Sequence, residues 1–185
     1  MKNKAEAGFT YIDVIVGMLI MLVGILALVS AISWSIFQSK GQEQQLYAKQ
    51  IASSTMESIM SVKETDLQVI PIRLGWTAVG NIGSNLNAMG NPQGIFLTGF
   101  QPVRMDAGPD QVIGTSDDAG TLVPGFQRRI IITDQCDFDR PSPNCTPPGT
   151  FPVRIRTVEV TITYFVGSVQ KQERLTTVLT NYAIT

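Results

Sequence analysis

One long apolar run near the N-terminus constrains this chain more than any other feature. The 24 residues from Val14 to Phe37 carry no charged side chain. A helix of about 20 predominantly apolar residues is enough to cross the hydrocarbon core of a bilayer. The run therefore predicts a transmembrane helix at about residues 12–37, and the rest of the 185-residue chain has room for one modest domain.

Asp13 stands at the start of this run. An ionised carboxylate inside a membrane helix is costly, and such residues usually have a partner and a purpose. One interpretation is local, because a carboxylate near a helix N-terminus is attracted by the helix dipole. The other is that Asp13 neutralises a positive charge that is buried in lipid or in a bundle of helices. Both can hold together.

Basic residues before the run indicate its orientation. Lys2 and Lys4 precede the apolar residues, so the positive-inside rule places the N-terminus in the cytoplasm. No A-x-A-like cleavage site follows the apolar core, as it would after an ordinary secretory signal. We therefore expect a single-pass membrane protein whose chain beyond Phe37 is exported.

Composition argues against an enzyme and against a nucleic-acid-binding protein. The 14 Lys and Arg residues nearly balance the 15 Asp and Glu residues, so no strong field attracts nucleic acid. Histidine is absent, which removes the usual general base and the commonest transition-metal ligand. Four arginines could form a local basic patch, but we expect them on the solvent face of a sheet: Arg128, Arg129, Arg154 and Arg156.

Periodicity predicts one long helix over residues 9–65. No proline occurs between residues 9 and 70, and apolar residues beyond Lys40 recur at helical spacing, so the second half of the helix should be amphipathic. These positions are Ala48, Ala52, Met56, Ile59 and Met60. Residues 74–98 are rich in Gly and Asn and predict turns and loops with little regular structure.

The C-terminal part predicts an antiparallel sheet in an α+β domain over residues 66–185. Strand character appears in residues 128–133, 153–166 and 169–184, all rich in β-branched side chains. Gly167-Ser168 fits a two-residue type II′ turn between the last two strands. An apolar series alternates with Thr and Glu, so one face should pack inward on the helix and the other should meet solvent: Val158, Val160, Ile162 and Tyr164.

The two cysteines lie close together in the sequence. Cys136 and Cys145 enclose eight residues that include two prolines, which favours a small closed loop. In an exported domain we expect the pair to form a disulfide. A zinc site is the weaker alternative, because no histidine can complete the ligand set.

An acidic loop, DAGPDQVIGTSDDAG, is a candidate calcium site. Asp106, Asp110, Asp117 and Asp118 fall within thirteen residues that also contain Gly and Pro. Ca²⁺ takes six to eight oxygen ligands, which such a flexible turn can supply. The pattern resembles Asp-rich calcium loops of bacterial surface proteins, although its spacing departs from the EF-hand. The alternative is a solvated polar loop. A second acidic cluster is interpreted as surface charge: Asp134, Asp137 and Asp139.

Residues 2–28, KNKAEAGFTYIDVIVGMLIMLVGILAL, resemble the N-terminus of type IV prepilins and related pseudopilins. In that family a short basic leader ends in Gly just before Phe, and an acid occupies the fifth mature position. The resemblance implies that residues 1–8 are a leader, that prepilin peptidase cuts between Gly8 and Phe9, and that Phe9 is then N-methylated. It also implies that Asp13, where the family usually has Glu, pairs with the Phe9 amine of a neighbouring subunit.

The resemblance extends the expectations to fold and function. The C-terminal hairpin is similar to that of minor pilins of the PilV kind, so we expect a long N-terminal helix packed on a C-terminal antiparallel sheet. The implied function is that of a minor type IV pilin, a structural subunit in the priming or tip complex of a pilus. Its partners would be prepilin peptidase, other pilin subunits and the bacterial inner membrane. The alternatives are a pseudopilin of type II secretion and an adhesive or DNA-uptake module of a pilus.

Overall fold

The structure is a computed structural model that describes residues 10–65, 68–69, 72–73, 75–86, 91–135, 137 and 153–182. The chain divides into two compact units, Met1–Glu43 and Gln44–Thr185. The boundary between the units lies within the single described helix, α1, which runs from Tyr11 to Glu64. The predicted long helix is confirmed over these residues.

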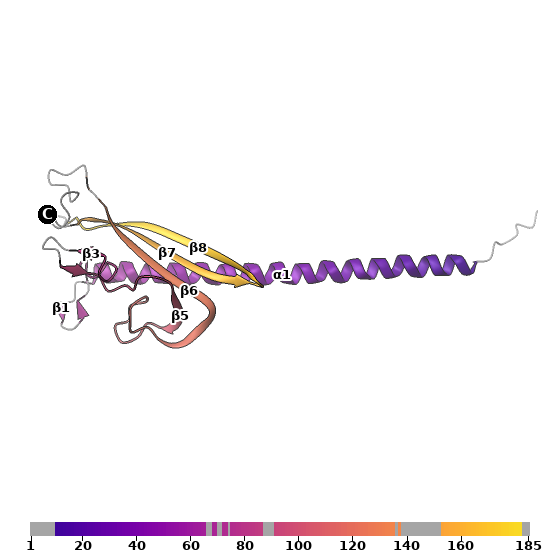
Figure 1. Ribbon diagram of the computed structural model, residues 1–185, viewed down its shortest axis with the longest axis horizontal. Helices are drawn as coiled ribbons and strands as arrows, with labels where there is room; N and C mark the ends of the chain where they lie inside the picture. Colours follow the sequence, from indigo (N-terminus) through magenta and orange to yellow (C-terminus); the bar gives the residue numbers. More distant parts are fainter. Residues whose placement is uncertain are drawn as a thin grey trace, which may run out of the picture. The chain divides into compact units, whose positions relative to one another are not determined.

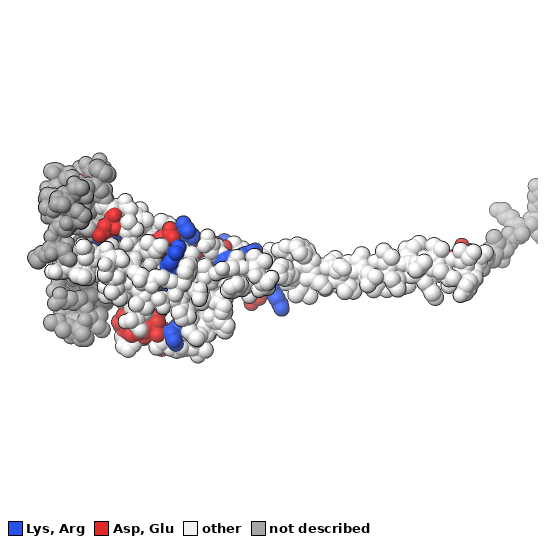
Figure 2. Space-filling model, viewed as in Figure 1, with Lys and Arg blue, Asp and Glu red and all other residues white. Residues whose placement is uncertain are grey.

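The part of α1 in the first unit is apolar on every side. Residues 10–40 are all exposed, and the surface drawn over Val14–Phe37 in Figure 2 carries no charge. Trp34 and Phe37 stack on one another with ring centroids 6.1 Å apart. Helices that are hydrophobic all round are buried in lipid or among other helices. By length and composition α1 can therefore span a membrane.

The second unit contains a four-stranded antiparallel sheet with the strand order β5-β6-β7-β8 (Figure 1). Its strands are β5 (Gln101–Asp106), β6 (Ala119–Gln135), β7 (Ile155–Val166) and β8 (Val169–Thr180). Two short antiparallel pairs precede the sheet: β1 (Gln68–Val69) with β2 (Ile72–Arg73), and β3 (Asn85–Leu86) with β4 (Pro92–Gln93). The α+β layout predicted from the sequence is confirmed.

One face of the sheet forms the core with the C-terminal part of α1. Predicted helix positions Ala48, Ala52, Met56 and Ile59 are buried, and the inward series from Val158 to Tyr164 is at most 1% exposed. Met60 was predicted to be buried but is 38% exposed. It follows Ile59 by about 100° around the helix, which turns it away from the sheet.

The sheet is larger than the sequence predicted. Residues 119–127 contain Gly120, Pro124 and Gly125, which read as turn signals, yet they belong to β6. Both glycines have φ near +80°, and the β5–β6 ladder shifts register around Arg104. Bulges of this kind let a strand continue through residues that would end a regular one. The short partner β5 was not predicted, and as an edge strand it tolerates Pro102.

The hairpin between β7 and β8 has the predicted turn. Val166 pairs with Val169, so Gly167 and Ser168 form a two-residue connection. Gly167 has φ of 63°, whereas Ser168 is not among the described residues with positive φ. A positive φ at the first position alone is the requirement of a type II′ turn.

The outer face of β7 is less exposed than the sequence predicted. Thr161 and Thr163 are 0% and 7% exposed. The reason is their position on an inner strand, because Arg129 of β6 and Arg174 of β8 lie directly beside Thr161. Long side chains on two neighbouring strands cover a short one between them.

Candidate functional site

Asp13 lies in the first turn of α1 and is bound to Thr10. The Thr10 backbone N–H and hydroxyl both donate to Asp13 Oδ2, at 3.0 and 2.7 Å. In return the Asp13 N–H donates to the Thr10 hydroxyl at 3.4 Å. This reciprocal arrangement is a capping box, which satisfies N–H groups that a helix N-terminus leaves without partners. Asp13 therefore caps the helix N-terminus through hydrogen bonds, and its attraction by the helix dipole stays a prediction.

Thr10 is not among the site residues predicted from the sequence, although the sequence contains a signal for it. Threonine followed three residues later by an acid, just before an apolar run, marks a capped helix start. Asp13 Oδ1 makes no hydrogen bond with any residue that the structure describes. One carboxylate oxygen therefore holds the helix cap, and the other is free for a second partner. Gly8 and Phe9 lie outside the described residues.

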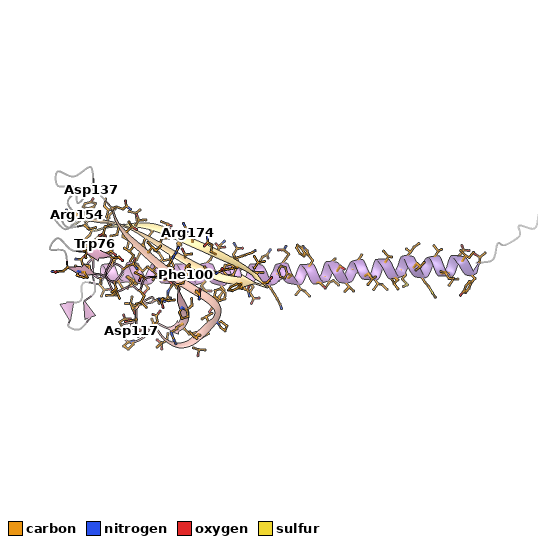
Figure 3. The ribbon with its side chains drawn as sticks, viewed as in Figure 1. Trp76, Phe100, Asp117, Asp137, Arg154 and Arg174 are labelled. Carbon is orange, nitrogen blue, oxygen red and sulfur yellow. The ribbon has the colours of Figure 1, made fainter. Side chains whose placement is uncertain are left out.

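The acidic loop between β5 and β6 is organised by its own carboxylates (Figure 3 labels Asp117). Asp106 Oδ1 accepts the Gly108 N–H at 3.0 Å, and Asp110 Oδ1 accepts the Val112 N–H at 2.8 Å. Asp117 accepts the Asp110 N–H at 3.1 Å through Oδ2 and the Thr115 hydroxyl through Oδ1. Side chains of this type commonly hold tight turns by bonding to nearby backbone.

Asp118 points to a different partner. It forms an ion pair with Arg128 of β6 and accepts the Gly114 N–H at 3.0 Å. Arg128 was predicted to lie on the solvent face, but it is on the inner face and only 2% exposed. Burial lowers the pKa of Arg128, and the negative charge of Asp118 opposes that shift. The pair ties the acidic loop to the sheet.

Asp110 and Asp117 differ in their protonation equilibria. Burial raises the pKa of Asp110, and the nearby charge of Asp117 raises it further, against the hydrogen bond from Val112. Burial also raises the pKa of Asp117, but its hydrogen bonds from Thr115 and Asp110 outweigh burial and leave this pKa below the ordinary value. The pKa of Asp117 therefore lies below that of Asp110.

The four loop aspartates do not converge on one point in this conformation. Within the described ranges, no three His, Cys, Asp or Glu side chains are grouped closely enough to hold a metal ion. Asp110 and Asp117 are neighbours, whereas Asp118 is engaged by Arg128. Calcium binding by this loop stays a prediction.

Arg156 is a second arginine that the sequence wrongly placed on the solvent face. It is fully buried, and its guanidinium donates to Asp134 Oδ1 at 2.9 Å. It also donates to the carbonyl oxygens of Trp76 and Val79, both at 2.6 Å, and to Gln93 Oε1 at 2.8 Å. The Trp76 ring lies 4.8 Å from the guanidinium carbon. Arg156 therefore joins the segment around residues 75–93 to the sheet.

The second acidic cluster is not simple surface charge. Asp134 forms the ion pair with Arg156, and Asp137 is 6% exposed and accepts the hydroxyl of Tyr182. Asp139 lies outside the described residues, as do Cys136 and Cys145, so the predicted disulfide is not tested.

Comparison of the chain with protein-family models, with curated protein sequences and with solved structures gives no match. In the absence of a match, the class of protein is described by the fold and the N-terminal site alone. The chain has an N-terminal apolar helix that can span a membrane, and the last turns of this helix pack on a four-stranded antiparallel sheet.

Proposed function

We propose that this chain is a minor type IV pilin. It is inserted in the bacterial inner membrane, cut and N-methylated by prepilin peptidase, and built into the priming or tip complex of a pilus. The observation that carries the proposal is the order of features at the N-terminus. A Gly8-Phe9 junction stands directly before the capped start of an uncharged helix that can span a membrane.

The geometry around Asp13 supports its proposed role in assembly. Cleavage after Gly8 would create an ammonium group on Phe9, the residue before Thr10. In lipid such a charge requires a counter-ion. Asp13 Oδ2 is held by Thr10, while Oδ1 has no described partner and can accept a hydrogen bond from the Phe9 amine of a neighbouring subunit.

The first experiment tests processing. We expect mass spectrometry of the protein from cells with prepilin peptidase to show loss of residues 1–8 and gain of one methyl group on Phe9. An intact N-terminus in such cells would refute the proposal.

The same cells separate the capping role of Asp13 from its role in assembly. Asp13→Ala should insert and be processed, but its incorporation into filaments should fall, because the counter-ion is lost. Thr10→Val is the matched control, since it removes the capping hydroxyl and keeps the carboxylate. If Thr10→Val lost as much incorporation as Asp13→Ala, capping would explain the effect. Asp13→Asn should behave like Asp13→Ala if charge is what matters.

A pseudopilin of type II secretion would share this leader, junction and anchor. The genes beside this one distinguish the two, because secretion components would favour a pseudopilin. A run of small prepilin-like proteins with a large tip protein would favour a pilus. An adhesive or DNA-uptake role would be an additional property of the same head.

A further inference from the structure

Arg129 of β6 lies on the outer face of the sheet, opposite the core. Its neighbours along β6, at 128 and 130, are buried on the inner face. On the outer face Arg129 lies beside Thr161 of β7, and Thr161 in turn lies beside Arg174 of β8. Two arginines thus flank a threonine across three neighbouring strands.

Arg129, like Arg104 of β5, has no acidic partner among the described residues, but Arg104 donates to the Gly120 carbonyl oxygen at 3.0 Å, whereas Arg129 has no such acceptor. Arg128 is paired with Asp118, Arg156 with Asp134, and Arg174 with Glu159 at 3.3 Å. Arg129 makes neither a hydrogen bond nor an ion pair with any described residue, and its Nε atom is shielded from solvent without a partner. Its terminal nitrogens are not enclosed in this way. A guanidinium with unmet donors favours an acceptor from outside.

Phe100 holds this guanidinium in place. The guanidinium carbon of Arg129 lies 4.7 Å from the centre of the Phe100 ring. Stacking on an aromatic ring fixes the plane of the guanidinium and leaves its edge free for a bidentate carboxylate. The site is therefore already arranged before any partner binds.

An exposed apolar side chain lies beside the pair. Phe100 itself is 41% exposed, and Ile131, two residues along the same face of β6, is 37% exposed. Arginine and aromatic residues beside aliphatic ones are typical of the centres of protein interfaces. A free phosphate would pair with the charge but would leave these apolar groups uncovered.

We propose that the outer face of the sheet binds a partner protein through an Asp or Glu side chain of that partner. The partner's carboxylate accepts hydrogen bonds from the terminal nitrogens of Arg129. The apolar groups beside that carboxylate cover Phe100 and Ile131. The proposal does not depend on the pilin function, because it rests on this face alone.

The experiment uses the full chain in detergent micelles and a fluorescent hexaglutamate peptide as the probe, with hexaglutamine as the neutral control. We expect saturable binding of hexaglutamate alone, with a shift of the Arg129 Nε–H resonance in arginine-labelled protein. Arg129→Gln should weaken binding roughly tenfold or more, because it removes charge-assisted hydrogen bonds. Arg174→Gln is the matched control and should change binding by less than about threefold, since Glu159 already satisfies that arginine.

Three results would overturn the proposal. The first is that hexaglutamate binds no better than hexaglutamine, and the second is that Arg129→Gln and Arg174→Gln weaken binding equally. A uronic-acid oligosaccharide that bound through Arg129 more tightly than hexaglutamate would overturn the assignment of the partner as a protein. Unfolding of Arg129→Gln is checked by circular dichroism, and Arg129→Lys, which keeps the charge but loses the planar fork, should then show intermediate affinity.

Discussion

Arg156 is a single buried charged residue whose hydrogen bonds connect several segments of the second unit. A guanidinium with no exposed surface has left water, and its stability depends on the groups that replace that water. Asp134 supplies the charge, and Trp76, Val79 and Gln93 supply acceptors. The residue therefore specifies where the segment containing Trp76 must lie against β7.

Replacing Arg156 by Met should lower the free energy of unfolding by about 3–5 kcal/mol, because it leaves the buried Val79 carbonyl without its donor and the Asp134 carboxylate without the positive charge that balances it. Denaturant unfolding of the full chain in detergent, followed by near-UV circular dichroism, measures the change. Arg174→Met is the control, since its pair with Glu159 is half-exposed and such pairs contribute about 0–1 kcal/mol. Equal costs for the two variants would contradict the role given to Arg156.

At the scale of elements, the last turns of α1 hold the sheet through one narrow face. Ile59 lies at the centre of this face with no exposed surface, whereas Met60 is partly exposed. Tyr47 packs edge-on against Phe126, with ring centroids 5.3 Å apart, and Phe126 stacks on Tyr164. These contacts define the rotation of the helix about its own axis against the sheet.

Ile59→Ala should reduce the free energy of unfolding by about 2–5 kcal/mol, because it opens a cavity between helix and sheet. Met60→Ala, the next residue along, should cost less than about 1 kcal/mol, since its side chain lies at the edge of the core. The two variants are compared by denaturant unfolding under the same conditions. A larger effect at residue 60 than at residue 59 would show that the helix is rotated from the position described.

The acidic loop between β5 and β6 allows a direct test of calcium binding. Asp110 and Asp117 lie together, and burial followed by the nearby charge of Asp117 raises the pKa of Asp110, so a cation beside them would relieve this repulsion. We expect Ca²⁺ to raise the melting temperature of the full chain. The stabilisation would be about 2.7 kcal/mol when free calcium is a hundredfold above Kd.

Two variants distinguish a calcium ligand from a structural carboxylate in this loop. Asp117→Asn should abolish the calcium-dependent rise. Asp118→Asn should lower the melting temperature equally with calcium and with chelator, because it breaks the pair with Arg128. A melting temperature of the parent that does not respond to calcium would identify a loop ordered by its own hydrogen bonds.

At the scale of the whole molecule, the two units have different requirements. The residues of α1 up to Phe37 expose apolar side chains on all sides and need lipid or other helices around them. The second unit has its own core of helix and sheet residues. Because the second unit has its own core, its fold would not have to change if the subunit moved from the membrane into a filament, as the proposed function requires.

The sequence by itself determined the features that depend on local pattern. The apolar run predicts a spanning helix because insertion depends on length and composition. The alternation from Val158 to Tyr164 predicts a buried face because strand side chains alternate, and Gly167-Ser168 predicts its turn because only Gly readily adopts positive φ there.

Tertiary structure alone decided which polar groups meet. Arg128 and Arg156 read as solvent-facing residues until Asp118, Asp134 and distant carbonyl groups are brought to them. Thr161 is covered in part by Arg129 of β6, which no local pattern places beside β7, and β5 forms by pairing with residues 119–128 of β6, the part that contains its glycines. Burial of a charge depends on partners that are remote in sequence, and no local pattern contains them.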